Sequence, residues 1–238
     1  MEWPKLIAHR GASAYAPENT LVAFELALRQ GIDWIECDVT LSKDGVPVIF
    51  HDKTFKRMAN RTKYINQLTF EEIMQIDVGA WFSKKFSGQT TPTLEELLIF
   101  AKENQIKINL ELKPNAYKPK CLVMQVDQLI RQTNFTKNDL LISSFDSTSL
   151  MYAYKYMPQI QRGLLMDKWR RNWHHLAEKF QVSSIHCHYK LCTKERINKI
   201  KQANYKLYCY TVNNGSKADK LFKKGIDGIF SDYPDLLT

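Results

Sequence analysis

Residues 34–51, WIECDVTLSKDGVPVIFH, indicate the fold more clearly than any other part of the chain. An apolar run over 34–41 is followed by Asp44-Gly45, a dipeptide typical of hairpin turns, and then by a second extended run that ends at His51. The pattern predicts a strand that folds back on itself. A two-residue turn at Asp44-Gly45 would place Asp38 opposite His51 on one face of the hairpin.

The run at 34–41 is one of eight apolar runs that alternate with helical patterns of about 10 to 15 residues. The runs are 6–9, 34–41, 107–112, 140–144, 162–166, 184–188, 206–211 and 228–231. The helical patterns include 21–29, 94–103, 122–132, 169–180, 194–203 and 217–224. This alternation predicts repeated βα units, and the length of 238 residues suits a (β/α)8 TIM barrel of roughly 250 residues.

The chain reads as one domain over residues 1–238, with a small insertion after the hairpin. No fixed-period repeat, low-complexity tract or linker divides it. The stretch 52–92 lies between the hairpin and the next barrel strand and contains a short helix candidate at 70–76. We expect this insertion to cover the mouth of the barrel.

Composition favours a small anionic partner and a reducing compartment. The chain has 34 Lys and Arg against 25 Asp and Glu, a net charge of +9, but the basic residues are scattered, which argues against specific nucleic-acid binding. Five cysteines without a C-x-x-C pair suggest neither a disulfide framework nor a zinc ribbon. Without an apolar run long enough to insert into a membrane, the sequence predicts a cytoplasmic protein.

Polar side chains are concentrated at the ends of the first predicted strands, where barrel enzymes keep their active sites. The strand-end residues are His9, Arg10, Glu36, Asp38, His51, Glu111 and Lys113. Residues two apart share a face of a strand, so Glu36 pairs with Asp38, and Glu111 with Lys113. Three carboxylates with no cysteine cluster predict a site for one divalent cation, Mg²⁺ or Ca²⁺.

The basic strand-end residues suit phosphate chemistry. Because imidazole titrates near neutral pH, His9 and His51 can act as general acid and general base. Arg10 and Lys113 can bind phosphate oxygens. His186-Cys-His188 has a spacing seen in metal sites, but no third ligand is evident, and we expect His188 to be structural.

Several ordered motifs resemble the glycerophosphodiester phosphodiesterase family, and the stretch 162–191 is most similar to that of the cytoplasmic bacterial enzymes. The motifs are His9-Arg-Gly11, Pro17-Glu-Asn-Thr20, Glu36-Cys-Asp38, Lys43-Asp-Gly45, His51-Asp52, Glu111-Leu-Lys113, Ser143-Ser-Phe145, Tyr210-Thr-Val-Asn213 and Gly225-Ile-Asp-Gly228. The resemblance implies a (β/α)8 barrel that hydrolyses glycerophosphocholine, glycerophosphoethanolamine and similar diesters to glycerol 3-phosphate and an alcohol.

The resemblance also implies roles for individual residues. The metal ligands would be Glu36, Asp38 and Glu111, the acid/base pair His9 and His51, and the substrate-binding residues Arg10, Lys113, Trp81, Phe82 and Tyr210. Trp81 and Phe82 belong to the 52–92 insertion, which resembles the family's cap over the mouth. Tyr210 stands where the family commonly has Trp. Asn19 could cap the helix at 21–29, and Glu18 could support the metal site or Arg10.

Two other functions fit parts of the sequence. A phospholipase or phosphodiester lyase of the phosphatidylinositol type would use a similar barrel and paired histidines, and would release a cyclic phosphate. A non-catalytic barrel that binds anionic metabolites or RNA would account for the charge alone. The sequence leaves open the preferred headgroup, the choice of Mg²⁺ or Ca²⁺, which histidine is the base, whether water or a glycerol hydroxyl attacks first, and the oligomeric state.

Overall fold

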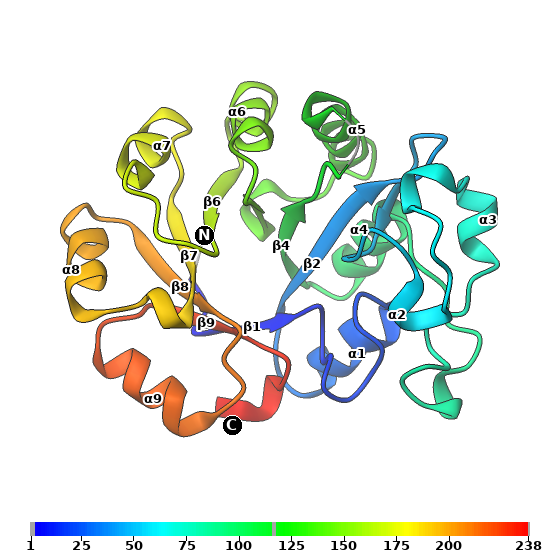
Figure 1. Cartoon of the computed structure of the whole chain (residues 1–238), viewed down its shortest axis with the longest axis horizontal. Helices are drawn as coiled ribbons and strands as arrows, with labels where there is room; N and C mark the ends of the chain where they lie inside the picture. Colours follow the sequence, from blue (N-terminus) through cyan, green and yellow to red (C-terminus); the bar gives the residue numbers. More distant parts are fainter. Residues whose placement is uncertain (1–2, 116–117, 238) are drawn as a thin grey trace.

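The computed structural model describes residues 3–115 and 118–237, and within these ranges parallel strands close into a barrel ringed by helices (Figure 1). The strands are β1 (Leu6–His9), β2 (Trp34–Leu41), β3 (Pro47–Ile49), β4 (Lys107–Leu112), β5 (Leu140–Ser144), β6 (Gln161–Met166), β7 (Ser184–His188), β8 (Lys206–Tyr210) and β9 (Gly228–Ser231). Their order is β1-β9-β8-β7-β6-β5-β4-β2, and β1 pairs with β2 to close the ring. The predicted (β/α)8 barrel is therefore confirmed.

Helices follow the strands around the outside of the barrel. They are α1 (Leu21–Arg29), α2 (Lys56–Ala59), α3 (Phe70–Met74), α4 (Leu94–Glu103), α5 (Pro119–Gln132), α6 (Ser147–Tyr156), α7 (Trp173–Lys179), α8 (Lys194–Gln202) and α9 (Gly215–Lys223), with 3₁₀ turns η1 (Ile65–Gln67), η2 (Lys84–Phe86), η3 (Lys137–Asp139), η4 (Tyr189–Leu191) and η5 (Pro234–Leu237).

Caps explain where several helices depart from their predicted bounds. Helix α5 begins three residues early because Pro119 occupies its first turn, where a missing N–H costs nothing. Helix α9 begins at Gly215 because the Asn214 side chain accepts a hydrogen bond from the Lys217 N–H. Helix α7 is shorter than expected and begins only at Trp173. The predicted helices did not include α6, which Asp146 caps by accepting from the Ser149 N–H.

The predicted register of the β2–β3 hairpin is wrong by one residue. Val39 pairs with Ile49, which places Phe50 rather than His51 beside Asp38, and the Phe50 N–H donates to the Asp38 carbonyl over 2.9 Å. The turn is longer than the Asp-Gly signal suggested, because only Gly45 adopts a positive φ, of 84°. A three-residue loop with glycine in this conformation is a common hairpin alternative.

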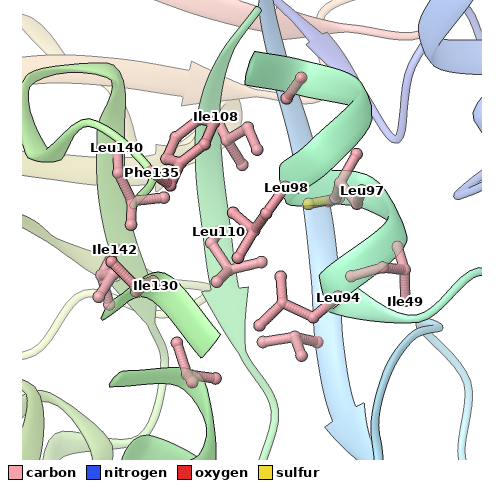
Figure 2. Packing of buried hydrophobic residues seen from close by; sticks show 14 of the residues in the cluster. Ile49, Leu94, Leu97, Leu98, Ile108, Leu110, Ile130, Phe135, Leu140 and Ile142 are labelled. Carbon is pink, nitrogen blue, oxygen red and sulfur yellow. The ribbon is translucent and has the colours of Figure 1, made fainter. Parts of the chain in front are cut away.

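Alternation along each strand divides the barrel into an outer and an inner layer. Figure 2 shows Leu94, Leu97 and Leu98 of α4 packed against Ile108 and Leu110, which point outward from β4. The residues between them on β4 therefore point into the barrel. An inner cluster of Ile7, Trp34, Leu141, Tyr208 and Phe230 fills its lower part. The polar inward residues at the other end of the strands consequently stand on an apolar floor.

The chain between β3 and α4, which includes the predicted insertion at 52–92, carries α2, η1, α3 and η2. Together with Val48 of β3, its apolar side chains form a cluster separate from those of the barrel wall. The buried members are Val48, Phe50, Phe55, Met58, Ile65, Leu68, Ile73, Ile76 and Val78. In Figure 1 this segment lies at one side of the barrel, beside α1 and α4.

Across residues 3–115 and 118–237, every helix is too short or too polar to pass through a lipid bilayer.

Candidate active site

A cavity of about 340 Å³ opens at the carboxyl ends of the strands. Its lining residues are His9, Arg10, Glu36, His51, Asn109, Glu111, Ser143, Phe145, Leu165, His188, Tyr210, Thr211 and Phe230. The strand ends thus bring both predicted catalytic histidines to one chamber with two of the three predicted metal ligands. Asp38 and Lys113 do not line the cavity but lie next to Glu111. The Lys113 Nζ is 3.5 Å from Glu111 Oε1 and 3.3 Å from Asp38 Oδ1.

The three carboxylates converge as the sequence predicts. One oxygen from each of Glu36, Asp38 and Glu111 lies within 4.8 Å of the others, and all three side chains are buried. Among the described residues this is the one group of three or more acidic, His or Cys side chains placed to hold a metal ion. An all-oxygen set of this kind suits Mg²⁺ or Ca²⁺ better than zinc.

Burial and crowding oppose simultaneous ionisation of the trio. Burial and then the charges of Asp38 and Glu111 raise the pKa of Glu36 well above its ordinary value. Burial and the charge of Asp38 raise the pKa of Glu111 to about 7. Burial would also raise the pKa of Asp38, but the cations of Lys113 and Arg10 outweigh it and lower that pKa. The negative charge of the three carboxylates is therefore only partly offset by their neighbours, and a divalent cation bound between them would supply the missing positive charge.

His9 is held by a carboxylate on its outer side. Its Nδ1 lies 2.6 Å from Asp232 Oδ1, and its Nε2 lies 3.9 Å from Glu36 Oε2. Asp232 is itself fixed, since it accepts hydrogen bonds from the Ser13 hydroxyl and the Asn213 amide. An Nδ1–H donated to Asp232 leaves Nε2 to face the cavity. Burial, followed by the charge of Arg10, lowers the pKa of His9.

His51 is held in the same way by a different carboxylate. Its Nδ1 lies 2.7 Å from Asp52 Oδ1, and Asp52 Oδ2 accepts from Arg57 Nε over 2.9 Å. His51 reaches the cavity because it lies beyond the end of β3, where the chain has left the hairpin. The predicted proximity of His51 to the carboxylates therefore holds, although the predicted register that led to it does not.

Arg10 and Glu18 connect the carboxylates of β2 to Arg57 on helix α2 of the insertion. The Arg10 N–H donates to Glu36 Oε2 over 3.0 Å, and its guanidinium lies 3.4 Å from Asp38 Oδ2. The same guanidinium donates to Glu18 Oε1 over 2.8 Å, and Glu18 accepts two further hydrogen bonds from Arg57. Of the alternatives for Glu18, support of Arg10 is the one that the structure contains.

Asn19 holds the carboxylate of Asp38 rather than capping a helix. Thr20 caps α1 by accepting from the Ala23 N–H, so Asn19 is not the cap. Its side-chain amide donates to Asp38 Oδ2 over 2.9 Å, and its side-chain oxygen faces the Asp38 N–H at 3.3 Å. Both contacts hold the Asp38 carboxylate in place.

Of the three aromatic residues predicted to bind substrate, one lines the cavity and two lie outside its lining. Tyr210 lines the cavity and packs edge-on against Phe145 and His188, with ring centroids 5.9 and 6.0 Å apart. His188, expected to be structural, is thus part of the cavity wall. Trp81 and Phe82 pack on each other outside the lining, and the Trp81 ring lies 5.4 Å from the Arg57 guanidinium.

The sequence patterns predict no role for Asp52, Asp232 or Arg57. A signal existed for the two aspartates, since Asp52 follows His51 directly and Asp232 follows the last strand, at the end of the barrel where polar residues matter. Arg57 had no such signal, because it lies on a four-residue helix within the insertion.

Comparisons with known proteins agree in family and fold. A family model described as the glycerophosphoryl diester phosphodiesterase family matches residues 9–236. A glycerophosphodiester phosphodiesterase from Caldanaerobacter subterraneus subsp. tengcongensis is 34% identical over 98% of this chain and 95% of its own length. One from Bacillus altitudinis is 33% identical over 97% of this chain and 95% of its own.

Solved structures give the same result. A phosphodiesterase from Oleispira antarctica, determined in complex with the product sn-glycerol-3-phosphate, is 36% identical and superposes with a TM-score of 0.94, covering 98% of this chain and 94% of its own. A glycerophosphodiester phosphodiesterase from Agrobacterium tumefaciens is 28% identical with a TM-score of 0.81, covering 98% and 97%.

Proposed function

This chain belongs to the glycerophosphoryl diester phosphodiesterase family and is a phosphoric diester hydrolase, and from that premise we propose its substrates and the roles of its residues. The substrates are deacylated phospholipids such as glycerophosphocholine and glycerophosphoethanolamine, and the products are glycerol 3-phosphate and an alcohol. The observation that carries this proposal is a cavity lined by two carboxylate-held histidines and by two members of a cluster of three buried carboxylates.

The size of the cavity supports a small diester. A volume of about 340 Å³ is at the lower end for ligand sites, and it suits a glycerol phosphate with a short alcohol better than a lipid that retains its acyl chains. The Oleispira antarctica neighbour was determined with sn-glycerol-3-phosphate, which supports the proposed product.

Glu36, Asp38 and Glu111 would hold one divalent cation, either Mg²⁺ or Ca²⁺. Their buried oxygens lie within 4.8 Å of one another, and the raised pKa values of Glu36 and Glu111 reflect burial and negative charge that no described cation fully offsets. A cation there supplies Lewis acidity and neutralises phosphate charge.

His9 and His51 act as the acid/base pair. With each Nδ1 directed at a carboxylate, each ring presents Nε2 as its second proton-transfer atom. One Nε2 accepts the proton of the attacking nucleophile, either water or a glycerol hydroxyl, and the other donates a proton to the departing alcohol oxygen. Arg10 and Lys113 bind phosphate oxygens and offset the charge that develops on them.

The aromatic side chains contact the glycerol and alcohol parts of the substrate. Tyr210 forms the wall beside Phe145 and His188. Trp81 and Phe82 act at the rim, on the part of the alcohol that extends beyond the cavity. We further propose that the chain works in the cytoplasm as one domain over residues 1–238, with 52–92 as its cap.

The deciding experiment is glycerol 3-phosphate release from the two diesters by purified protein, first in EDTA and then with Mg²⁺ or Ca²⁺ restored. Release that depends on metal is expected, and the restoring ion identifies the cofactor. A cyclic phosphate product would instead favour the lyase alternative. If neither diester releases glycerol 3-phosphate with either metal ion, the proposed substrate class is overturned.

A further inference from the structure

Three of the five cysteines gather behind the cavity wall, on the outer side of the barrel. Cys187 on β7 and Cys209 on β8 are register partners in adjacent strands, and Cys192 follows η4 in the loop that leads to α8. All three are buried, and Cys192 retains the largest exposed fraction, 6%. The Cys192 and Cys209 sulfur atoms lie only 3.0 Å apart.

We propose that Cys192 and Cys209 form an oxidation-sensitive dithiol, which a peroxide converts into an intramolecular disulfide and a thiol reductant restores. The Cys192 thiolate attacks one peroxide oxygen, so the O–O bond breaks, one water is released after protonation, and Cys192 becomes a sulfenic acid. The Cys209 thiol then attacks that sulfur, the S–O bond breaks, and a second water leaves with the Cys209 proton. Two thiols lose two electrons, and one peroxide gains them.

The geometry brings these two sulfur atoms close to bonding distance. A disulfide has an S–S distance of about 2.05 Å, so the sulfurs need to approach by only about 1 Å. Cys192 lies in a loop, which can move, whereas Cys187 and Cys209 are held in neighbouring strands of the barrel. Cys192 is therefore the partner that completes the approach.

The environment also favours Cys192 as the attacking group. Hydrogen bonds from the thiols of Cys187 and Cys209 lower the pKa of Cys192, and the same contact with Cys192 is the largest of the effects that raise the pKa of Cys209. The thiolate is the nucleophilic form of cysteine, so the first oxidation falls on Cys192 and the second thiol acts as the resolving group.

The dithiol is close to the cavity wall in the chain as well as in space. Tyr210 directly follows Cys209, and His188 directly follows Cys187; both Tyr210 and His188 line the cavity. The Cys192 sulfur also lies 4.0 Å from the His188 carbonyl. A disulfide would thus draw the loop after β7 toward β8 behind two residues of the wall.

The test uses the full chain with the exposed Cys121 replaced, Cys121→Ser, so that no disulfide forms between molecules. The protein is treated with hydrogen peroxide, quenched, unfolded and alkylated with N-ethylmaleimide, and its mass is measured before and after dithiothreitol. Trypsin then separates the three thiols, because Lys190 lies between Cys187 and Cys192 and the Cys209 peptide spans 207–217.

The expected result is the loss of two alkylated thiols, a single cross-linked pair of peptides carrying Cys192 and Cys209, and full reversal by dithiothreitol. Cys187→Ser in the same background should keep this cross-link, and Cys192→Ser should lose it. A cross-link that involves Cys187, oxidation to sulfinic or sulfonic acid without a disulfide, or unchanged alkylation would each overturn the proposal. None of these readouts depends on catalysis, so the outcome is independent of the proposed function.

Discussion

Asp232 Oδ1 lies 2.6 Å from His9 Nδ1, although 223 positions separate the two residues in the chain. The residue after the last strand thus fixes the ring orientation of a residue that ends the first strand. Because β9 and β1 are hydrogen-bonded neighbours in the closed barrel, this contact exists only when the ring of strands is complete.

Asp232→Asn should lower kcat by roughly 10-fold or more while leaving KM nearly unchanged, because an amide no longer selects the His9 tautomer that presents Nε2 to the cavity. Steady-state kinetics on glycerophosphocholine measure both constants. Asp235→Asn is the matched control, since Asp235 accepts a hydrogen bond from the Tyr15 hydroxyl and does not line the cavity. Equal kcat values for Asp232→Asn and the parent protein would refute the positioning role.

His9→Ala and His51→Ala should each reduce turnover by about 100-fold or more, because each removes one proton-transfer group. Circular dichroism should show that both variants remain folded. His174→Ala, an exposed position on α7, should keep the parental rate. A variant of either cavity histidine that turns over at the parental rate would remove that histidine from the mechanism.

Mg²⁺ or Ca²⁺ should raise the melting temperature Tm of the metal-free enzyme. At a concentration 100 times Kd, a bound ion adds about 2.7 kcal/mol to the free energy of unfolding, which corresponds to roughly 5–10 °C for a chain of this size. Glu111→Gln should lose this shift without lowering the metal-free Tm, because it removes a carboxylate whose pKa burial and Asp38 raise to about 7. Calorimetry measures both, and an undiminished shift in the variant would exclude Glu111 as a ligand.

The free energy of unfolding should decrease in acid partly through His186. Burial lowers the pKa of this histidine to about 3, so the unfolded chain binds the proton more readily than the folded one below about pH 6.5. The contribution is present above that pH and is lost as the pH falls toward 3, by about 1.5 kcal/mol between pH 6.5 and 5. Urea unfolding of the metal-free protein should show a shallower pH dependence in His186→Gln, and identical slopes would contradict this account.

Tyr210→Phe should raise KM by roughly 2- to 12-fold, the value of one hydrogen bond, with little change in Tm. Because Tyr210 lines the cavity, we expect its hydroxyl to contact the substrate and its loss to remove that contact. Trp81→Ala, outside the cavity lining, should change KM less. If Trp81→Ala has the larger effect, the rim rather than the wall determines binding.

Much of the fold could be predicted because an inward and an outward face alternate along each barrel strand. On β4, for example, Asn109 and Glu111 lie between outward leucine and isoleucine residues, and such strands are recognisable from the sequence alone. The same periodicity paired Glu36 with Asp38, and the strand-end positions of the barrel added Glu111 to the group. Helix α6 was not predicted because its first turn, Ser147-Thr-Ser149, is a poor helix former without its Asp146 cap.

What could not be predicted depends on geometry that a local pattern does not contain. Asp44-Gly45 is compatible with a two-residue and a three-residue turn, and the choice moves His51 by one register position. The pairing of His9 with Asp232 requires knowledge of which strand ends meet when the barrel closes. The bridge from Arg57 to Glu18 requires the placement of a short helix by tertiary contacts.

The apolar cluster of the chain between β3 and α4, described above as separate from the clusters of the barrel wall, has a consequence for local opening. A unit with its own small core can lose its amide protection without global unfolding, so hydrogen exchange should be faster over α2 and α3 than over β4. Arg57 lies on α2 and holds Asp52, the partner of His51. Local opening of this unit therefore frees the His51 ring, so the order of this proposed acid or base depends on the stability of the segment rather than on the stability of the whole barrel.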